Sequence, residues 1–384
     1  MRIDQPESSY HLVDLFSGCG GASAGFLASG SFSHLYAADV DDWACQTYRR
    51  NLGQEAQVAD LRVLAEDDSW AERVRGDAKG RVLLFGGPPC QGFSSHVKMK
   101  GDRHGRNTLV GTFGRLAESL RPDVIVMENV PDLLSERWWP VFVDLRRSLQ
   151  EAGYTVRARI INFAQLGVPQ ERFRLVMLAS LHESPTFPQV RRAPADFTTV
   201  KEWIGHLPPV ESGQINARDP MHQASRHRES TLEIIRRVPL DGGNRPSDVG
   251  PECLQRARDA FGGYTDVYGR LSWSGTAPTI TARCRTPSCG RFIHPEQHRG
   301  LTAREAGLLQ TFPEDWFFCG PFDDRYKQIG NAVPPLAMQA IAEHIAAGYP
   351  AVTNEVGLFE AVDRPVGKSF SVLIPGIRRR GGVL

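Results

Sequence analysis

The N-terminal half of the chain alternates short apolar runs with turns rich in glycine, proline or polar residues. The runs that resemble strands are residues 11–16, 34–38, 82–85, 124–127 and 175–179. Runs of this length with few polar interruptions are typical of strands covered on both faces. Stretches typical of helices lie at 22–29, 141–152, 301–310 and 336–347. Strands that alternate with helices in this way predict an α/β fold.

One of these strands stops abruptly and is followed by a single thiol. Gly86 and Gly87 allow close backbone approach or a positive φ, while Pro88 and Pro89 fix φ and lack an N–H. Neither strand nor helix can continue through them, so Cys90 follows the carboxyl end of a buried strand. Open α/β sheets bind their ligands at that edge. From this stretch alone two interpretations stay open: Cys90 is a nucleophile, or it is a small buried hydrophobic residue.

The first strand runs into the glycine turn 17–21, and a helix follows. Strand, glycine turn and helix in this order favour a nucleotide site, although Ser23 stands where the dinucleotide fingerprint has its third glycine. The next strand ends in Asp39, where a carboxylate can accept both hydroxyls of a ribose, and Asp60 is a further acid at an expected strand end. The set predicts a pocket for an adenosine-containing ligand. The alternative is a glycine-lined turn with solvated acids.

Two further segments bring functional groups to strand ends. Glu128 follows the apolar residues 124–127, so its carboxylate should emerge at the same sheet edge as Cys90. In that half-buried place it needs a partner, or its pKa rises and it becomes a useful acid. Arg172 and Arg174 alternate before the strand at 175–179 and should point to one side. They could fix a polar substrate group or form an ordinary charged edge.

Positive charge gathers in two places, although the net charge of the whole chain is only +1. The segment 91–115 has five basic residues against the single acid Asp102, and its glycines favour a basic lid over an anionic substrate. A merely solvated loop is the other interpretation. The segment 278–304 has the same excess and is the better candidate for phosphate contacts. Its basic residues are Arg283, Arg285, Arg291, Arg299 and Arg304.

The composition changes near residue 182, where frequent prolines end the α/β alternation. We therefore expect a catalytic domain at 1–181 and 322–350, a smaller loop-rich domain at 182–321 and an irregular tail at 351–384. Seven scattered cysteines do not form a disulfide framework. The N-terminus lacks a signal peptide and no run has the length of a membrane span, so we expect a cytoplasmic protein. Cys284 and Cys289 have no second ligand pair to match their spacing, so we expect no metal.

Six segments together resemble the carbon-5 cytosine DNA methyltransferases, in the order of that family and over most of residues 11–346. The matching segments are Asp14–Gly21, Gly87–Ser94, Glu128–Val130, Gln170–Arg174, Arg304–Pro313 and Gly330–Pro335. The resemblance implies a Rossmann-like S-adenosylmethionine-dependent domain and a smaller target-recognition domain. It identifies Cys90 as the nucleophile.

The chemistry of the family explains why these residue types are needed. A thiolate that adds to ring carbon 6 of cytosine makes carbon 5 nucleophilic enough to take a methyl group. The resemblance implies that Glu128 holds ring nitrogen 3, that Arg174 binds the exocyclic oxygen and that Arg172 supports the site. The target base must be flipped out of the duplex, with the basic loop closing behind it. The product of the cofactor would be S-adenosylhomocysteine.

The resemblance also assigns binding residues for the cofactor and for double-stranded DNA. The expected cofactor positions are Phe16, Ser17, Gly18, Cys19, Gly20, Gly21, Asp39, Val40, Asp60, Leu61, Gly87, Pro89, Leu109, Asn331 and Val333. Asp39 replaces the more usual glutamate of the family, and its arm is shorter. The expected DNA contacts are Ser94, Lys98, Arg103, Arg106, Arg283 and Arg285.

Several functions remain to be weighed. A tRNA-methylating relative would share the catalytic parts but has a much shorter recognition region than the residues between Leu181 and Pro321. A silent DNA-binding relative should have lost Cys90, Glu128 or the arginines. Ser23 argues against a dinucleotide oxidoreductase. We expect a monomeric bacterial DNA methyltransferase that is either an orphan or the partner of a restriction endonuclease, acting in the cytoplasm and on the nucleoid.

Overall fold

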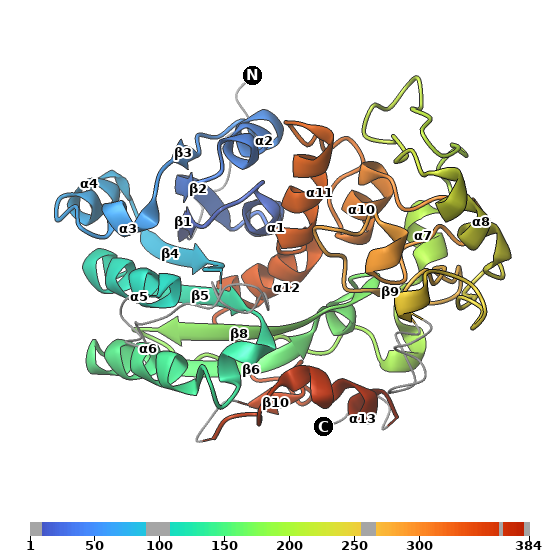
Figure 1. The fold of residues 1–384 in the computed structure, drawn as a ribbon. Coiled ribbons are helices and arrows are strands. Elements are labelled where there is room, and N and C mark those ends of the chain that lie inside the picture. Colours follow the sequence, from blue (N-terminus) through green and yellow to red (C-terminus); the bar gives the residue numbers. More distant parts are fainter. Residues whose placement is uncertain (1–9, 90–107, 255–265, 361–363, 380–384) are drawn as a thin grey trace. The chain divides into compact units, whose positions relative to one another are not determined.

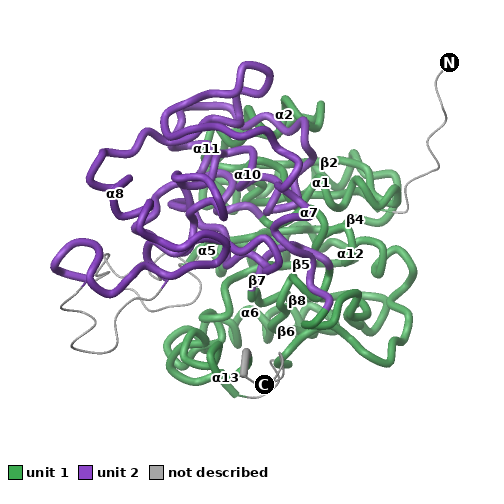
Figure 2. Tube along the Cα trace, turned by 90° about the vertical axis from the view of Figure 1, so that its right-hand side faces the viewer, with its two compact units in different colours: residues 1–166, 173–195, 333–384 green, residues 167–172, 196–332 purple. Residues whose placement is uncertain are grey.

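The computed structural model describes residues 10–89, 108–254, 266–360 and 364–379. The chain forms two compact units (Figure 2). Unit 1 comprises residues 1–166, 173–195 and 333–384, and unit 2 comprises 167–172 and 196–332. Each unit is continuous in space but not in sequence, because the chain crosses between them several times.

Unit 1 is built on an eight-stranded mixed sheet (Figure 1). Its strand order is β10 (Phe359–Glu360), β6 (Thr155–Asn162), β8 (Phe173–Ser180), β5 (Val124–Asn129), β4 (Arg81–Gly86), β1 (Tyr10–Leu15), β2 (Phe32–Asp39) and β3 (Gln57–Val58). The five strands from β5 to β3 run parallel, whereas β8 is antiparallel to both β5 and β6. The α/β fold predicted from the sequence is confirmed.

Helices cover both faces of this sheet. The largest apolar cluster joins the strands to helices α3 (Leu61–Leu64), α4 (Trp70–Asp77), α5 (Leu109–Leu120) and α6 (Trp139–Glu151). Helix α2 (Asp42–Leu52) packs separately against β2, through Cys45 and Tyr48. Helix α12 (Pro335–Ala346) lies against α1 (Gly21–Ala28) so closely that a Cβ on Gly25 would be 2.2 Å from the Pro335 carbonyl oxygen. The last predicted helix therefore returns to the first strands of the chain.

Two parts of unit 1 differ from the sequence-based expectation. The pattern did not predict β6, because Arg157 and Arg159 interrupt its apolar residues; both arginines form ion pairs with Glu355 and Glu360. The tail expected to be irregular contains β10, a 3-10 turn at Phe370–Val372 and α13 (Ile374–Arg379). Its apolar side chains join the main core, which a pattern of short isolated runs does not reveal.

Unit 2 has shorter elements and more loop. It includes α7 (Val200–Ile204), α8 (Glu229–Arg237), α10 (Ala303–Leu309) and α11 (Phe322–Asn331), and β7 (Gln170–Glu171) pairs in parallel with β9 (Ala277–Pro278). The capping box predicted for the helix at 301–310 is present, with Thr302 and Glu305 bonding reciprocally at the start of α10. Unlike the division expected from composition, unit 2 contains the short segment 167–172 and α11.

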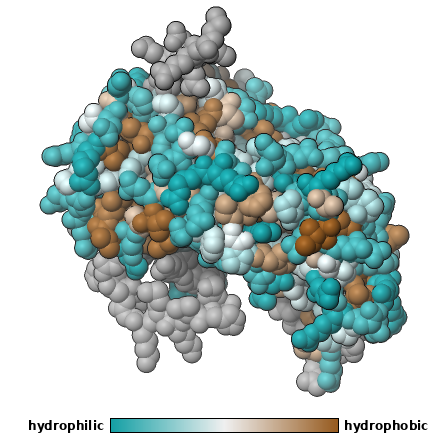
Figure 3. Space-filling view, turned by 90° about the horizontal axis from the view of Figure 1, so that it is seen from above, coloured by the Kyte–Doolittle hydropathy of each residue, from teal (hydrophilic) through white to brown (hydrophobic). Residues whose placement is uncertain are grey.

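The surface and the helices of the described residues bear on whether this chain could enter a membrane. On the face shown in Figure 3, hydrophobic residues form small separate areas among hydrophilic ones. Within the described ranges, none of the helices has the length and apolar character needed to cross a bilayer.

Candidate active site

The candidate active site of unit 1 lies at the carboxyl ends of β4 and β5. The two strands are parallel neighbours with Gly86 opposite Met127, so Gly87 and Glu128 come next on adjacent strands. A Cβ on Gly86 would lie 2.4 Å from the Phe113 ring, so only glycine fits beneath α5 at this point. The predicted shared edge of these strands is thereby confirmed.

A side-chain bond fixes the turn that leads to Cys90. Asn129 at the end of β5 donates its amide N–H to the carbonyl oxygen of Pro88 at 2.9 Å, and both groups are buried. The Asn129 side-chain oxygen in turn accepts from the N–H of Val130 at 2.9 Å. Cys90 itself lies outside the described residues. The tether through Asn129 is a feature that the sequence analysis missed, because an amide next to a functional acid gives no pattern of its own.

Glu128 and Arg174 form a largely buried ion pair. Their Oε1 and Nε atoms are 2.8 Å apart, and the side chains are 10% and 14% exposed. Beyond this contact, Glu128 Oε1 has no hydrogen-bond donor among the described residues. Burial lowers the pKa of Arg174, while the charge of Glu128 opposes that shift. The partner that the sequence analysis required for Glu128 is therefore Arg174 on the neighbouring strand β8.

Arg172 has different partners from Arg174. Its buried guanidinium donates to the carbonyl oxygens of Ile280 at 3.2 Å and Ala332 at 2.9 Å, both within unit 2. The neighbouring Gln170 donates to Leu309 O at 3.0 Å and accepts from Ile280 N at 2.8 Å. Arg172 and Gln170 therefore hold backbone segments together. The alternation of Arg172 and Arg174 in the sequence could not reveal that the two arginines have different partners.

The glycine turn after β1 has the backbone geometry of a ligand-binding loop. Phe16, Gly18 and Gly20 all have positive φ, at 60°, 52° and 89°. Asp39 at the end of β2 accepts from Gly18 N at 2.8 Å and from Asp41 N at 2.9 Å, one bond to each oxygen. Burial raises the pKa of Asp39, although these backbone N–H groups oppose the rise. A carboxylate offers about four acceptor positions, so capacity for two hydroxyls remains.

A buried polar chain lies beneath this loop and was not predicted. Tyr48 donates to the Ser23 hydroxyl at 2.8 Å, and Ser23 donates to Asp14 Oδ2 at 2.5 Å. Burial raises the pKa of Asp14 to about 7. Ser23, which breaks the dinucleotide fingerprint, therefore joins α1 to β1 by a hydrogen bond.

The remaining predicted cofactor residues have varied surroundings. Asp60 caps α3 and pairs with Arg62 at 2.7 Å, which lowers the pKa of its carboxyl. Val40 is 70% exposed, whereas Leu61 and Val333 are buried. Leu109 begins α5, and Asn331 ends α11 in unit 2. Their roles in binding, like those of Ser17, Cys19, Gly21, Gly87 and Pro89, stay predictions.

The predicted DNA contacts are only partly described. Ser94, Lys98, Arg103 and Arg106 lie outside the described residues. Arg283 is exposed, whereas Arg285 pairs with Asp323 at 2.8 Å. The contact role of these residues stays a prediction.

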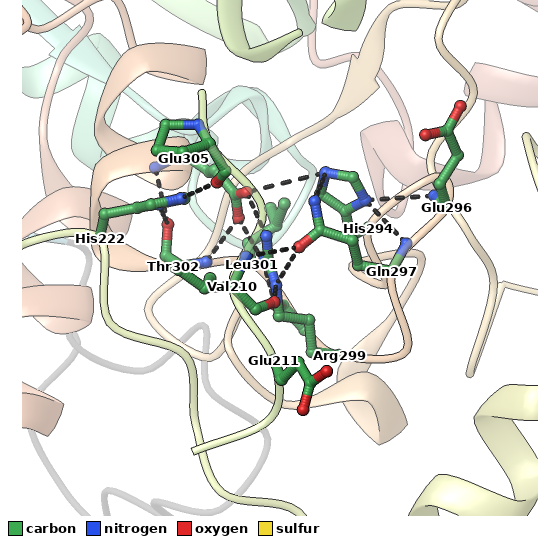
Figure 4. Close-up of polar contacts among 12 residues, drawn as sticks. Val210, Glu211, His222, His294, Glu296, Gln297, Arg299, Leu301, Thr302 and Glu305 are labelled. Carbon is green, nitrogen blue, oxygen red and sulfur yellow. Dashed lines mark hydrogen bonds and ion pairs between the residues drawn. The ribbon is translucent and has the colours of Figure 1, made fainter. Parts of the chain in front are cut away.

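The charge count over 278–304 overstated the positive surface, because two of its arginines are buried in ion pairs. Figure 4 shows one of these pairs, between Arg299 and Glu305. Arg299 is fully buried and binds both oxygens of Glu305 at 2.7 Å. Its other N–H groups donate to Val210 O, Gln297 Oε1 and Gly300 O. Arg304 binds both oxygens of Asp219, at 2.6 and 3.1 Å. The charges of Arg299 and Arg304 are therefore paired within unit 2.

In the described part of the chain, histidine, cysteine and acidic residues form no cluster of three or more that could hold a metal ion.

Known proteins that resemble this chain are methyltransferases. The family model for C-5 cytosine-specific DNA methylases matches residues 10–347. The type II methylase M.HgiDII of Herpetosiphon aurantiacus is 33% identical over 87% of this chain and 94% of its own length. The type II methyltransferase M1.HphI of Haemophilus parahaemolyticus is 35% identical over 87% of this chain and 86% of its own.

A solved structure shares the fold over the same extent. The crystal structure of a DNA modification methyltransferase encoded in an Escherichia coli prophage superposes with a TM-score of 0.68 at 22% identity, over 88% of this chain and 99% of that one. The predicted resemblance is confirmed. The chain belongs to the C-5 cytosine-specific DNA methylase family, whose members are methyltransferases that use S-adenosylmethionine.

Proposed function

We propose that this protein transfers a methyl group from S-adenosylmethionine to carbon 5 of a cytosine flipped out of duplex DNA, through a covalent adduct with Cys90. The observation that carries the proposal is the Glu128–Arg174 pair, 2.8 Å apart at the carboxyl end of β5. It lies on the strand next to Gly87, and Asn129 ties the same strand end to Pro88, two residues before Cys90. An acid, a guanidinium and the backbone that leads to Cys90 thus lie at one sheet edge.

The glycine turn and Asp39 fit the cofactor. Positive φ at Gly18 and Gly20 lets the backbone approach a ligand, and the Asp39 carboxylate is held by two N–H groups with acceptor capacity left for a ribose. When bound, S-adenosylmethionine supplies an electrophilic methyl group and leaves as S-adenosylhomocysteine. No metal is required by this chemistry.

Cys90 acts as the nucleophile. Its thiolate forms a bond to ring carbon 6, and the electrons of the double bond between carbons 5 and 6 shift so that carbon 5 can form a bond to the methyl group. A base, which can be water, then removes the hydrogen from carbon 5. The bond between sulfur and carbon 6 breaks, the double bond returns and the thiolate is regenerated.

Glu128 and Arg174 stabilise this addition. Glu128 holds ring nitrogen 3 where charge develops, and Arg174 binds the exocyclic oxygen beside it. Their pairing keeps both side chains oriented before a base enters, so little reorganisation is needed. Arg172 acts indirectly, because its bonds to Ile280 and Ala332 shape the end of α11.

DNA is favoured over tRNA as the substrate. The relatives that align over most of their own length at 33% and 35% identity are named type II methylases. Unit 2 supplies residues 196–332, which is enough chain for a target-recognition domain. We assign the protein to a bacterial restriction-modification setting, as a cytoplasmic monomer whose functional partner is a restriction endonuclease of the same sequence specificity.

The proposal is tested by expressing the chain in a host that lacks cytosine-5 methylation and sequencing the bisulfite-treated genome. We expect one short sequence to carry 5-methylcytosine, and none after Cys90→Ser, although that variant should still bind cofactor and DNA. Methylation of tRNA with unmodified genomic DNA would support the RNA alternative. Methylation that persists at the wild-type rate in Cys90→Ser would contradict the covalent route.

A further inference from the structure

The C-terminal segment 364–379 lies beyond the residues that match the family model, which end at 347. It nevertheless belongs to unit 1 and contributes to its main apolar core. Phe370 is 2% exposed and Ile377 is 1% exposed. A segment that buries such side chains is an integrated part of the unit, and its contacts show which active-site elements it supports.

The segment exchanges backbone bonds with the turn that follows Glu128. This turn is the 3-10 helix η2 (Pro131–Leu134), which begins three residues after Glu128. Val366 N donates to Leu134 O at 2.9 Å, and Glu136 N donates to Gly367 O at 2.9 Å. Two backbone hydrogen bonds therefore join the turn to the tail.

A side-chain bond reinforces this pairing. The Ser369 hydroxyl donates to Asp132 Oδ1 at 2.6 Å, and Phe370 N donates to the same oxygen at 3.3 Å. Asp132 lies four residues after Glu128, within η2. One carboxylate oxygen thus receives two donors from the tail.

The ring of Phe370 meets the other active-site strand. It packs against Phe173 at the start of β8, with ring centroids 5.5 Å apart. Successive side chains of a strand point to opposite faces, so Phe173 lies behind the sheet from Arg174. Arg174 also donates to the Phe173 carbonyl oxygen at 2.8 Å. Phe370 therefore supports the residue on which the position of the Arg174 guanidinium depends.

We propose that Ser369 and Phe370 are positioning residues, which hold the η2 turn and the start of β8 so that Glu128 and Arg174 keep their pairing. This assignment rests on the proposed roles of Glu128 and Arg174. It gives a role in the reaction to a C-terminal segment that lies outside the residues matched by the family model. Ion pairs of Glu355 and Glu360 with Arg157 and Arg159 anchor the chain just before this segment, so the tail starts from a fixed point.

The test compares Phe370→Ala with Leu149→Ala. Leu149 is fully buried in the same apolar cluster, but near the carboxyl end of α6, where its carbonyl oxygen accepts from Tyr154 N. Tyr154 in turn donates to the carbonyl oxygen of Pro122, just before β5. In Phe370→Ala we expect kcat to fall about tenfold with an unchanged Kd for S-adenosylmethionine, because small displacements of reacting groups cost rate. Amide exchange of residues 131–136 should become at least about tenfold faster. Phe370→Leu should restore most of both quantities, and Ser369→Ala should give a smaller change of the same kind.

Leu149→Ala should lose stability with kcat within about twofold of wild type. Equal loss of kcat in Leu149→Ala and Phe370→Ala would overturn the positioning role, and so would unchanged exchange at 131–136 in Phe370→Ala. The exchange measurement does not depend on the reaction. If the wild-type protein fails to methylate DNA but Phe370→Ala still exchanges faster than wild type at these residues, the proposed function is contradicted. The structural support of the turn by the tail would then remain.

Discussion

Two buried glutamate–arginine pairs, one in each unit, differ in how completely their hydrogen bonds are satisfied. In unit 2, Arg299 binds both oxygens of Glu305 at 2.7 Å, and Thr302 N donates to the same carboxylate at 2.8 Å. In unit 1, Glu128 and Arg174 meet through one contact at 2.8 Å, and Glu128 Oε1 accepts no hydrogen bond among the described residues.

Under the proposed function, this difference separates a structural pair from a reactive one. A buried carboxylate with all its partners is stabilised in place and has nothing to offer a substrate. A buried carboxylate with acceptor capacity left is costly unless something else binds it. The cost at Glu128 is explained if the exocyclic amino group of a bound cytosine donates to the carboxylate, while ring nitrogen 3 takes up its contact with Glu128 through a shared proton. Residue type and charge are the same in both pairs, so only the contacts distinguish them.

The largest expected effect is on the reactive pair. Glu128→Gln should lower kcat by about a thousandfold, because the group that holds ring nitrogen 3 is lost, while the protein stays folded. Methylation of a DNA duplex containing the target site measures kcat, and circular dichroism checks the fold. Glu183→Gln is the matched control, since Glu183 pairs with Arg81 at the amino end of β4. Equal kcat values for Glu128→Gln and wild type would contradict the assignment of Glu128 to a reactive pair.

The structural pair should respond in the opposite way. Glu305→Gln leaves the Arg299 charge buried without its partner, so unit 2 should lose about 3–5 kcal/mol of stability. Amide exchange over α10 reports this loss directly. Glu314→Gln removes an exposed glutamate near His206 and should change stability by less than about 1 kcal/mol. Unaltered exchange over α10 in Glu305→Gln would show that the pair does not stabilise the unit.

A smaller effect is expected when the pH is lowered, and it too should reduce the stability of unit 2. Burial acts to raise the pKa of Glu305, but the charge and hydrogen bonds of Arg299 outweigh it and hold this pKa at about 2. That carboxylate therefore contributes stability that is full above its ordinary pKa of 4.5 and is lost as pH falls toward 2. It should have little effect at mildly acidic pH.

Protonation of His294 should lower the stability of the protein at a higher pH than protonation of Glu305. Burial lowers its pKa to about 4, and its Nδ1 accepts from Glu296 N and Gln297 N, which requires the unprotonated atom. The unfolded chain takes up this proton near the ordinary value of 6.5, so stability should fall by about 2 kcal/mol between pH 7 and 5. Denaturant unfolding of wild type and His294→Gln measures it. A wild-type loss that persists in His294→Gln would assign the effect to another group.

Much of unit 1 could be predicted because its signals are local. Short apolar runs that end in glycine, proline or an acid marked the ends of β1, β4 and β5, and the structure places Glu128 and Gly87 on adjacent strands there. The capping box of α10 was also recognised from neighbouring residues.

What could not be predicted depends on contacts between distant residues. Arg299 and Arg304 were counted as surface charge because their acidic partners lie elsewhere in the fold, and Asp219 is 85 residues before Arg304. Arg172 donates to carbonyl oxygens, which leave no signal in side-chain chemistry. The tail reaches the core through Phe370 and Ile377, two apolar residues in a segment without periodicity.

The most direct test of the central claim uses DNA in which the target cytosine is replaced by 5-fluorocytosine, with S-adenosylmethionine present. Fluorine cannot leave from carbon 5 as a proton does, so the enzyme should remain attached to the DNA after methyl transfer. We predict an adduct that survives denaturation and that peptide mass spectrometry maps to Cys90, and none with Cys90→Ser. No adduct, with normal turnover on unmodified DNA, would contradict covalent catalysis by Cys90.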